Sequence, residues 1–147
     1  MTQNLPETAR SIPAALGLRA DAGQISKTAG YYVAFISLGL VLPVVLPLLN
    51  PPGEIVALVK PQFEVGRGQV GRRGVVKDPE KHRAVLTRLA DVAAGLSLCV
   101  WGITASPLLG PMGNREFLMH LRTGSTTLDT STLIARALGL SEALATT

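Results

Sequence analysis

Residues 55–78 read Ile-Val-Ala-Leu-Val-Lys-Pro-Gln-Phe-Glu-Val-Gly-Arg-Gly-Gln-Val-Gly-Arg-Arg-Gly-Val-Val-Lys-Asp. The apolar run at 55–59 is rich in β-branched side chains and lies between Gly53 and Pro61, which predicts a strand buried on both faces. Lys60 ends this strand, and the proline after it restricts its backbone. Because ligands of open α/β sheets bind outside the carboxyl ends of the strands, Lys60 is a candidate functional residue. A lysine that only marks where the strand meets water would give the same pattern.

Helix and strand patterns alternate along the rest of the chain. Asp78 and Pro79 are residue types preferred at a helix N-cap and first helical position, and an apolar stripe follows them as far as Gly95. The other expected elements are a strand at 31–36, a short helix that begins at Ser37, strands at 98–103 and 116–122, and a helix within 128–144. This order predicts half of an α/β sheet with mostly parallel strands.

Composition limits the classes of function. The chain has 147 residues, enough for one domain with a modest core, and a net charge of +4 that favours anionic partners such as RNA. Cys99 is the only cysteine, so the chain can form neither an intramolecular disulfide nor a cysteine metal cluster. This fits a reducing, cytoplasmic location, as does an amino terminus without a secretory signal pattern. Cys99 itself is expected to be a buried small hydrophobe.

The uncharged run at 31–49 is long enough for a transmembrane helix. Pro43 and Pro47 interrupt it, however, and favour a strand followed by a short helix that the prolines bend or end.

Three motifs carry a resemblance to a known family. They are Phe-Ile-Ser-Leu at 35–38, Leu-Val-Lys-Pro-Gln-Phe-Glu-Val-Gly-Arg-Gly-Gln-Val-Gly at 58–71, and Ser-Pro-Leu-Leu-Gly-Pro-Met-Gly-Asn-Arg-Glu-Phe at 106–117. Together, in this order, they resemble the hemolysin A (TlyA) family, which is similar to the FtsJ-type ribosomal RNA 2′-O-methyltransferases. The resemblance covers roughly residues 33–122. It implies an S-adenosylmethionine-dependent enzyme that acts on ribosomal RNA or a ribosomal subunit.

The resemblance also implies a fold and a division of the chain. The fold would be the C-terminal half of a Rossmann-like methyltransferase sheet, mostly parallel with an antiparallel last strand. Residues 1–30 would be an unmatched tail or cap, 31–123 a partial methyltransferase domain, and 124–147 a C-terminal helix or tail. Self-association could cover the sheet that such a half would expose.

By the same resemblance, Lys60 and Glu116 match the second lysine and the glutamate of the family's Lys-Asp-Lys-Glu catalytic tetrad. Glu116 would orient Lys60, and a glycine turn containing Gly110, Gly113 and Asn114 would position Glu116. Ala34 and Phe35 would contact the cofactor. Tyr32 stands where the family has its aspartate, and the first lysine and the cofactor loop have no counterpart in the chain.

These departures leave three functions open. The chain would be a truncated and impaired methyltransferase, a catalytically inactive basic remnant that binds RNA, or a membrane-active protein of the hemolysin type that uses the run at 31–49.

The basic loop after Lys60 allows two interpretations. Its Gly-Arg-Gly-Gln-Val-Gly at 66–71 fits the dinucleotide-binding pattern, but Arg72, Arg73 and Gly74 separate it from the next helix. A substrate-facing loop is the better interpretation, and a merely solvated loop stays open. In a substrate-facing loop the candidate RNA phosphate contacts are Arg67, Arg72, Arg73 and Lys77.

No catalytic or metal-binding role is expected for the two histidines or for Trp101. His82 and His120 have no partners at metal-ligand spacing, so no metal site is expected. Trp101 is expected to lie in a strand and to pack in the hydrophobic core.

Overall fold

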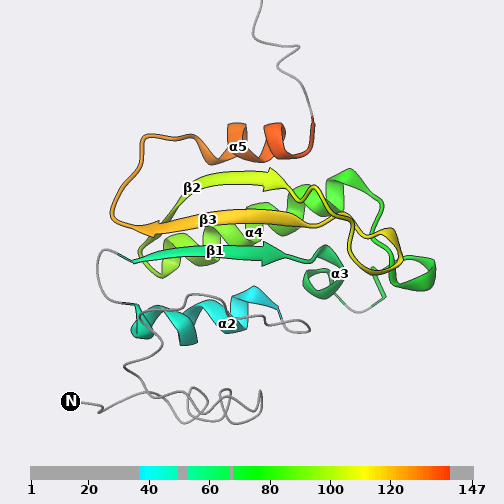
Figure 1. Cartoon of the computed structure of the whole chain (residues 1–147), viewed down its shortest axis with the longest axis horizontal. Helices are drawn as coiled ribbons and strands as arrows, with labels where there is room; N and C mark the ends of the chain where they lie inside the picture. The colour runs from blue at the N-terminus through cyan, green and yellow to red at the C-terminus, as the bar shows by residue number, and fades with distance from the viewer. Residues whose placement is uncertain (1–36, 50–52, 67, 140–147) are drawn as a thin grey trace, which may run out of the picture.

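The structure is a computed structural model that describes residues 37–49, 53–66 and 68–139 (Figure 1). Its elements follow one another as α2 (Leu38–Val45), the 3₁₀ turn η1 (Leu46–Leu48), β1 (Glu54–Val59), α3 (Pro61–Glu64), η2 (Arg72–Gly74), α4 (Pro79–Gly95), β2 (Leu98–Ala105), η3 (Pro111–Gly113), β3 (Phe117–Thr123) and α5 (Thr130–Ala137). The alternation of helix and strand confirms the α/β class.

The three strands form one sheet in the order β1-β3-β2, and both neighbouring pairs are antiparallel. The prediction of mostly parallel strands is therefore wrong for the described strands, while the antiparallel last strand is confirmed. The cause is topological. Because α4 leads from β1 to β2, those two strands run in the same direction, but β3 lies between them and pairs with both. The strand expected at 31–36 lies outside the described residues.

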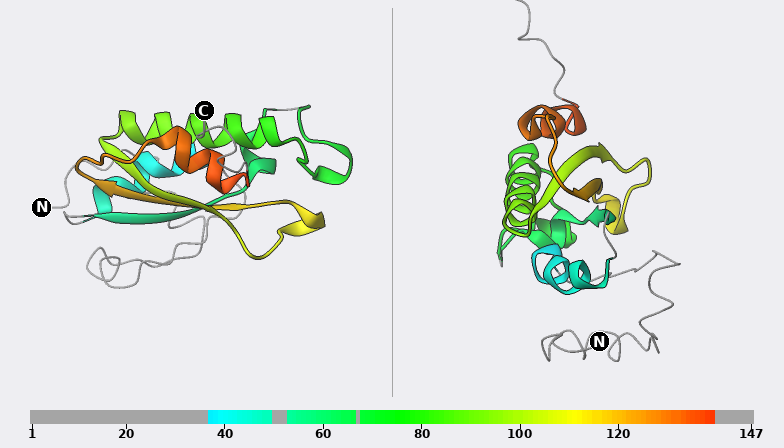
Figure 2. Two further views of the ribbon diagram at one scale, coloured as in Figure 1. Left: turned by 90° about the horizontal axis from the view of Figure 1, so that it is seen from above. Right: turned by 90° about the vertical axis from the view of Figure 1, so that its left-hand side faces the viewer.

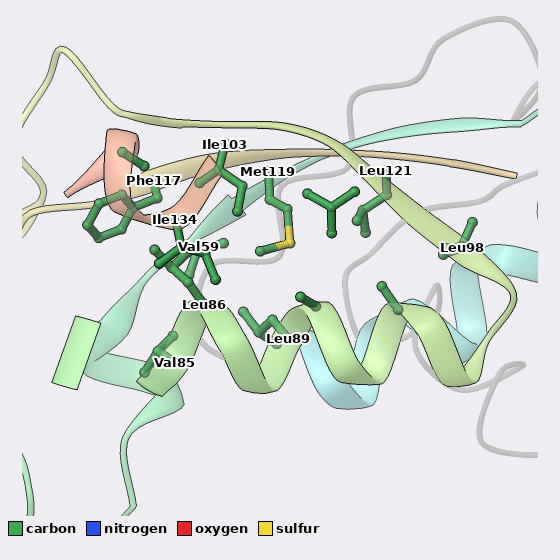
Figure 3. Packing of buried hydrophobic residues seen from close by; sticks show 14 of the residues in the cluster. Val59, Val85, Leu86, Leu89, Leu98, Ile103, Phe117, Met119, Leu121 and Ile134 are labelled. Carbon is green, nitrogen blue, oxygen red and sulfur yellow. The ribbon is translucent and has the colours of Figure 1, made fainter. Parts of the chain in front are cut away.

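Helix α4 forms as its sequence predicts. Asp78 is the N-cap, and its Oδ1 accepts a hydrogen bond from the Glu80 N–H at 2.9 Å. Pro79 takes the first helical position, where its missing N–H costs no hydrogen bond, and Gly95 is the last helical residue. Figure 3 shows the buried face of α4 packed against β1 and β3 through Val59, Val85, Leu86, Leu89, Phe117, Met119 and Leu121.

Helix α5 lies within the stretch 128–144, where a helix was expected. Ile134 and Ala137 are buried in the same core as α4, which ties the segment after β3 to the sheet. Its N-cap Asp129 accepts hydrogen bonds from the Thr132 N–H and Oγ1 at 2.8 and 2.7 Å. These bonds to Thr132 lower the pKa of Asp129, because they favour its charged form.

The two faces of the sheet differ. Helices α4 and α5 lie on one side of it (Figure 2), whereas on the other side Val56 is 67% exposed and Leu58 37% exposed. The expectation that the strand at 55–59 is buried on both faces is therefore wrong. Its apolar run resembles a two-sided core strand, but the described helices cover only one face.

Trp101 and Cys99 also differ from expectation. Trp101 is 37% exposed on β2, and the Arg122 guanidinium lies 4.3 Å from the centre of its ring. Cys99 is only partly buried and donates its S–H to the Arg122 carbonyl oxygen at 3.3 Å. Both lie on the sheet face that no described helix covers, and the Arg122 side chain packs over the indole ring there.

The described part of the run at 31–49 forms a short helix. Ser37 is the N-cap of α2, and its Oγ accepts from the Gly39 N–H at 3.2 Å. The helix contains Pro43, ends at Val45 and continues as the 3₁₀ turn η1, which contains Pro47. Among the described residues, no helix is long and apolar enough to cross a membrane.

Candidate functional site

Lys60 and Glu116 form an ion pair at the carboxyl end of β1. The Lys60 Nζ donates to the Glu116 Oε1 at 2.8 Å, and the two side chains are only 20% and 6% exposed. The β1–β3 register explains this contact. Val59 pairs with Phe117, so continuing the antiparallel ladder by one residue places Lys60 opposite Glu116. The strand pairing thus brings together two residues that lie 56 positions apart in the sequence.

Glu116 is enclosed by close neighbours. A Cβ built on Gly110 would lie 2.1 Å from the Glu116 Oε1, so only glycine leaves room for this carboxylate. The Gln62 Nε2 donates to the same oxygen at 3.3 Å. Within the described residues, the Gln62 Oε1 is buried and has no hydrogen-bond partner. The arrangement leaves an unsatisfied acceptor beside the Lys60–Glu116 pair.

Asn114 shapes the loop that carries Glu116. It is 2% exposed, and its Nδ2 donates to the carbonyl oxygens of Gly74 and Pro111 at 2.9 and 3.0 Å. Gly113 has a φ of 84°, which glycine adopts without strain. The expected turn before Glu116 is confirmed, and Asn114 additionally ties it to the basic loop.

Glu64 fixes the short helix that follows Lys60. Its side chain is 1% exposed and forms an ion pair with Arg88 of α4. It also accepts from the Ser37 Oγ and the Leu38 N–H, both at 2.7 Å. One buried carboxylate therefore links α2, α3 and α4 next to the Lys60 backbone. The sequence predicted no role for Gln62 or Glu64 beyond their place in a motif, because their partners are distant in sequence.

The basic loop is exposed. Arg72, Arg73 and Lys77 are solvent-exposed, and Arg67 lies outside the described residues. The 3₁₀ turn η2 and residues 75–78 separate the glycine pattern from α4, as the sequence indicated. Lys81, which sequence reasoning did not name, joins this group through a hydrogen bond from its Nζ to the Gln69 carbonyl oxygen at 2.7 Å.

The two histidines make structural contacts. The His82 Nε2 lies 2.9 Å from the Val76 carbonyl oxygen, and the His120 Nε2 lies 3.2 Å from the Glu54 Oε2. No group of three or more His, Cys, Asp or Glu side chains in the described ranges could hold a metal ion. Tyr32, Ala34 and Phe35 lie outside these ranges, so the expected cofactor contacts stay a prediction.

Residues 24–123 match the family model described as FtsJ-like methyltransferase. The chain belongs to the FtsJ-like methyltransferase family. The resemblance found in the three motifs is confirmed, and the match includes both Lys60 and Glu116.

The chain is similar to several curated relatives. It is 49% identical over 89 residues to YqxC of Bacillus subtilis, described as a candidate rRNA methyltransferase, covering 60% of this chain and 32% of YqxC. It is 47% identical over 91 residues to the 16S/23S rRNA (cytidine-2′-O)-methyltransferase TlyA of Mycobacterium tuberculosis, covering 62% and 34%. It is 33% identical over 88 residues to Hemolysin A of Brachyspira hyodysenteriae, covering 60% and 37%. The alignments thus span about a third of each relative.

Two solved structures share the fold. A candidate hemolysin from Streptococcus thermophilus superposes with a TM-score of 0.70 at 37% identity, covering 83% of this chain and 46% of that one. A candidate hemolysin from Lactococcus lactis gives a TM-score of 0.66 at 34% identity, covering 80% and 61%.

Proposed function

We propose that this chain is the carboxy-terminal part of a TlyA-type methyltransferase that transfers a methyl group to a ribose 2′-oxygen of ribosomal RNA. The observation that carries the proposal is the Lys60–Glu116 pair, enclosed by Gly110 and Gln62 at the end of β1 in a chain of this family. The substrate is inferred from the 47% identity to a protein named for this reaction.

Lys60 acts on the proton of the ribose hydroxyl. A hydroxyl is a weak nucleophile while protonated, and an amine at a strand end can accept its proton or stabilise the forming alkoxide. Glu116 holds the Lys60 Nζ in place and balances its charge, since its Oε1 is already 2.8 Å away. S-adenosylmethionine, when bound, supplies the electrophilic methyl group; Ala34 and Phe35 are its proposed contacts. Arg67, Arg72, Arg73 and Lys77 are the proposed contacts to RNA phosphates.

We expect the chain alone to be impaired. Tyr32 takes the place of the aspartate that the family resemblance calls for, and a tyrosine hydroxyl supplies no carboxylate at neutral pH. This observation favours the second candidate function, an RNA-binding protein without catalysis. Self-association through the sheet face that the described helices leave open and a cytoplasmic location stay predictions.

A chimera separates the two functions. The segment of Mycobacterium tuberculosis TlyA that aligns with this chain, extended to the position that matches Tyr32, is replaced by the matching residues of this chain. Methyl transfer from labelled S-adenosylmethionine to ribosomal RNA is then measured. Transfer by the chimera supports a competent catalytic half-site, whereas a folded chimera that binds RNA without transfer supports the non-catalytic function. A second chimera with Tyr32→Asp shows whether that position limits the rate.

A further inference from the structure

A hollow of about 310 Å³ lies beside the amino end of α4. Its walls come from the basic loop and from the first turn of the helix. The volume is near the lower end of the roughly 300–1,000 Å³ that small-molecule sites span. Half of its lining residues are charged, which indicates that a ligand there would carry a charged group.

The charges around the hollow favour an anion. Arg72, Lys77 and Lys81 line it, against the single carboxylate of Asp78. The Asp78 Oδ1 already accepts the Glu80 N–H, so part of its hydrogen-bonding capacity is used as a helix cap. Within the described ranges, neither Arg72 nor Lys77 forms an ion pair with a carboxylate. Their charges are therefore available to a ligand.

One of the cations is held in position by the protein. The Lys81 Nζ donates to the Gln69 carbonyl oxygen at 2.7 Å, and both residues line the hollow. A lysine ammonium has three donors, so two remain for an anion after this bond is made. A positioned ammonium loses less conformational entropy on binding than a free one.

The wall of the hollow is joined to the loop that carries Glu116. The Val76 N–H donates to the Asn114 Oδ1 at 3.0 Å, and Asn114 precedes Glu116 by two residues. The Asn114 Nδ2 donates to the Gly74 carbonyl oxygen on the same stretch of the basic loop. Figure 1 shows the two loops at the same end of the sheet. An anion in the hollow would thus occupy a fixed place relative to the Lys60–Glu116 pair.

We propose that this hollow binds one backbone phosphate of the RNA, with Arg72, Lys77 and Lys81 as its ligands. The inference rests on the proposed function and adds to it a defined phosphate site and a further residue, Lys81. It also separates two neighbours in the basic loop, because Arg72 lines the hollow and Arg73 does not.

The test measures binding of a short fluorescent single-stranded oligoribonucleotide to the full chain by anisotropy at several KCl concentrations. Log affinity falls as log salt rises, and for a single strand each lost phosphate contact decreases the magnitude of this slope by about 0.7. We expect this decrease and a weaker affinity for Arg72→Gln and for Lys81→Met. The matched control is Arg122→Gln, at the opposite end of the β1–β3 ladder from Lys60, and it should leave the slope unchanged. Circular dichroism and thermal unfolding identify any variant that fails to fold, and Arg72→Gln keeps the test decisive if Lys81→Met does.

Three results would overturn the proposal. Equal decreases for Arg72→Gln and Arg122→Gln would show that the net charge of the protein alone attracts the RNA, and unchanged slopes for Arg72→Gln and Lys81→Met would place the hollow outside the interface. Saturable binding of inorganic phosphate that Arg72→Gln abolishes, without oligoribonucleotide binding, would assign the hollow to a free anion. The assay requires no methyl transfer. Hollow-dependent RNA binding together with an inactive chimera would therefore contradict the proposed function and support the phosphate site.

Discussion

The two ends of the β1–β3 ladder each carry a pair of opposite charges in the same antiparallel register. At one end Glu54 pairs with Arg122, and their side chains are 52% and 34% exposed. At the other end Lys60 meets Glu116, whose side chain is 6% exposed. Strand pairing produces both contacts, but only the second is enclosed by α3 and the loop around Gly110. Enclosure distinguishes the candidate site from an ordinary surface ion pair.

The difference has energetic consequences. Exposed ion pairs contribute about 0–1 kcal/mol, because water and salt screen them. A buried carboxylate costs desolvation energy and is retained where partners hold it or where it serves chemistry. The comparison therefore predicts that substitutions near Glu116 affect methyl transfer, while those near Glu54 affect neither activity nor folding strongly.

The largest expected effect after loss of Lys60 itself is that of Glu116→Gln. In the TlyA chimera we expect the rate of methyl transfer to fall by about 100-fold, a size typical of lost proton-transfer support. Glutamine keeps the shape but removes the charge that holds Lys60. Glu54→Gln is the matched control at the other end of the ladder, and we expect it to keep the full rate. Equal rates for the two variants would remove Glu116 from the mechanism.

Gly110→Ala tests the enclosure. The added Cβ would lie 2.1 Å from the Glu116 Oε1, so the carboxylate must move away from Lys60. We expect a loss of about 1–3 kcal/mol in the free energy of unfolding, as for overpacked sites, together with slower transfer by the chimera. Gly95→Ala is the control, because nothing lies within 4 Å of its Cβ position. Urea unfolding of both variants provides the measurement. An unchanged stability and rate for Gly110→Ala would show that Glu116 is not confined.

Glu64→Ala compares a buried carboxylate with the exposed Glu54. The change removes the acceptor of Ser37 and Leu38 and the ion pair with Arg88. Because Arg88 is 45% exposed, we expect a loss of about 2 kcal/mol, below the range for fully buried pairs. Glu54→Ala should cost no more than about 0.5 kcal/mol. Urea unfolding measures both, and equal losses would contradict the distinction between buried and exposed pairs.

Local sequence signals predicted the elements of this fold well. The cap at Asp78, the end of α4 at Gly95 and the turn before Glu116 follow from residue types whose effects act within a few positions. The insertion of β3 between β1 and β2 did not follow, since the order of elements does not show whether a later strand fills the space left by a crossover. The exposure of Val56 and Trp101 was missed for a related reason, because burial depends on which elements cover each face.

The candidate site was only partly predictable. Lys60 and Glu116 were found through motif resemblance, whereas the register that joins them is a property of the sheet. Gln62, Glu64 and Lys81 gave no signal of their own, because each acts through a partner that only the fold identifies.

The most direct test of the account is the single-turnover rate of methyl transfer to ribosomal RNA by the TlyA chimera and by its Lys60→Met variant. Methionine keeps much of the length and apolar stem of lysine but cannot accept or donate the proton. The account predicts a decrease of about 10²- to 10⁴-fold with the fold intact, as expected for loss of a general acid or base. A Lys60→Met chimera that transfers methyl at the full rate would contradict the central claim that the Lys60–Glu116 pair carries the chemistry.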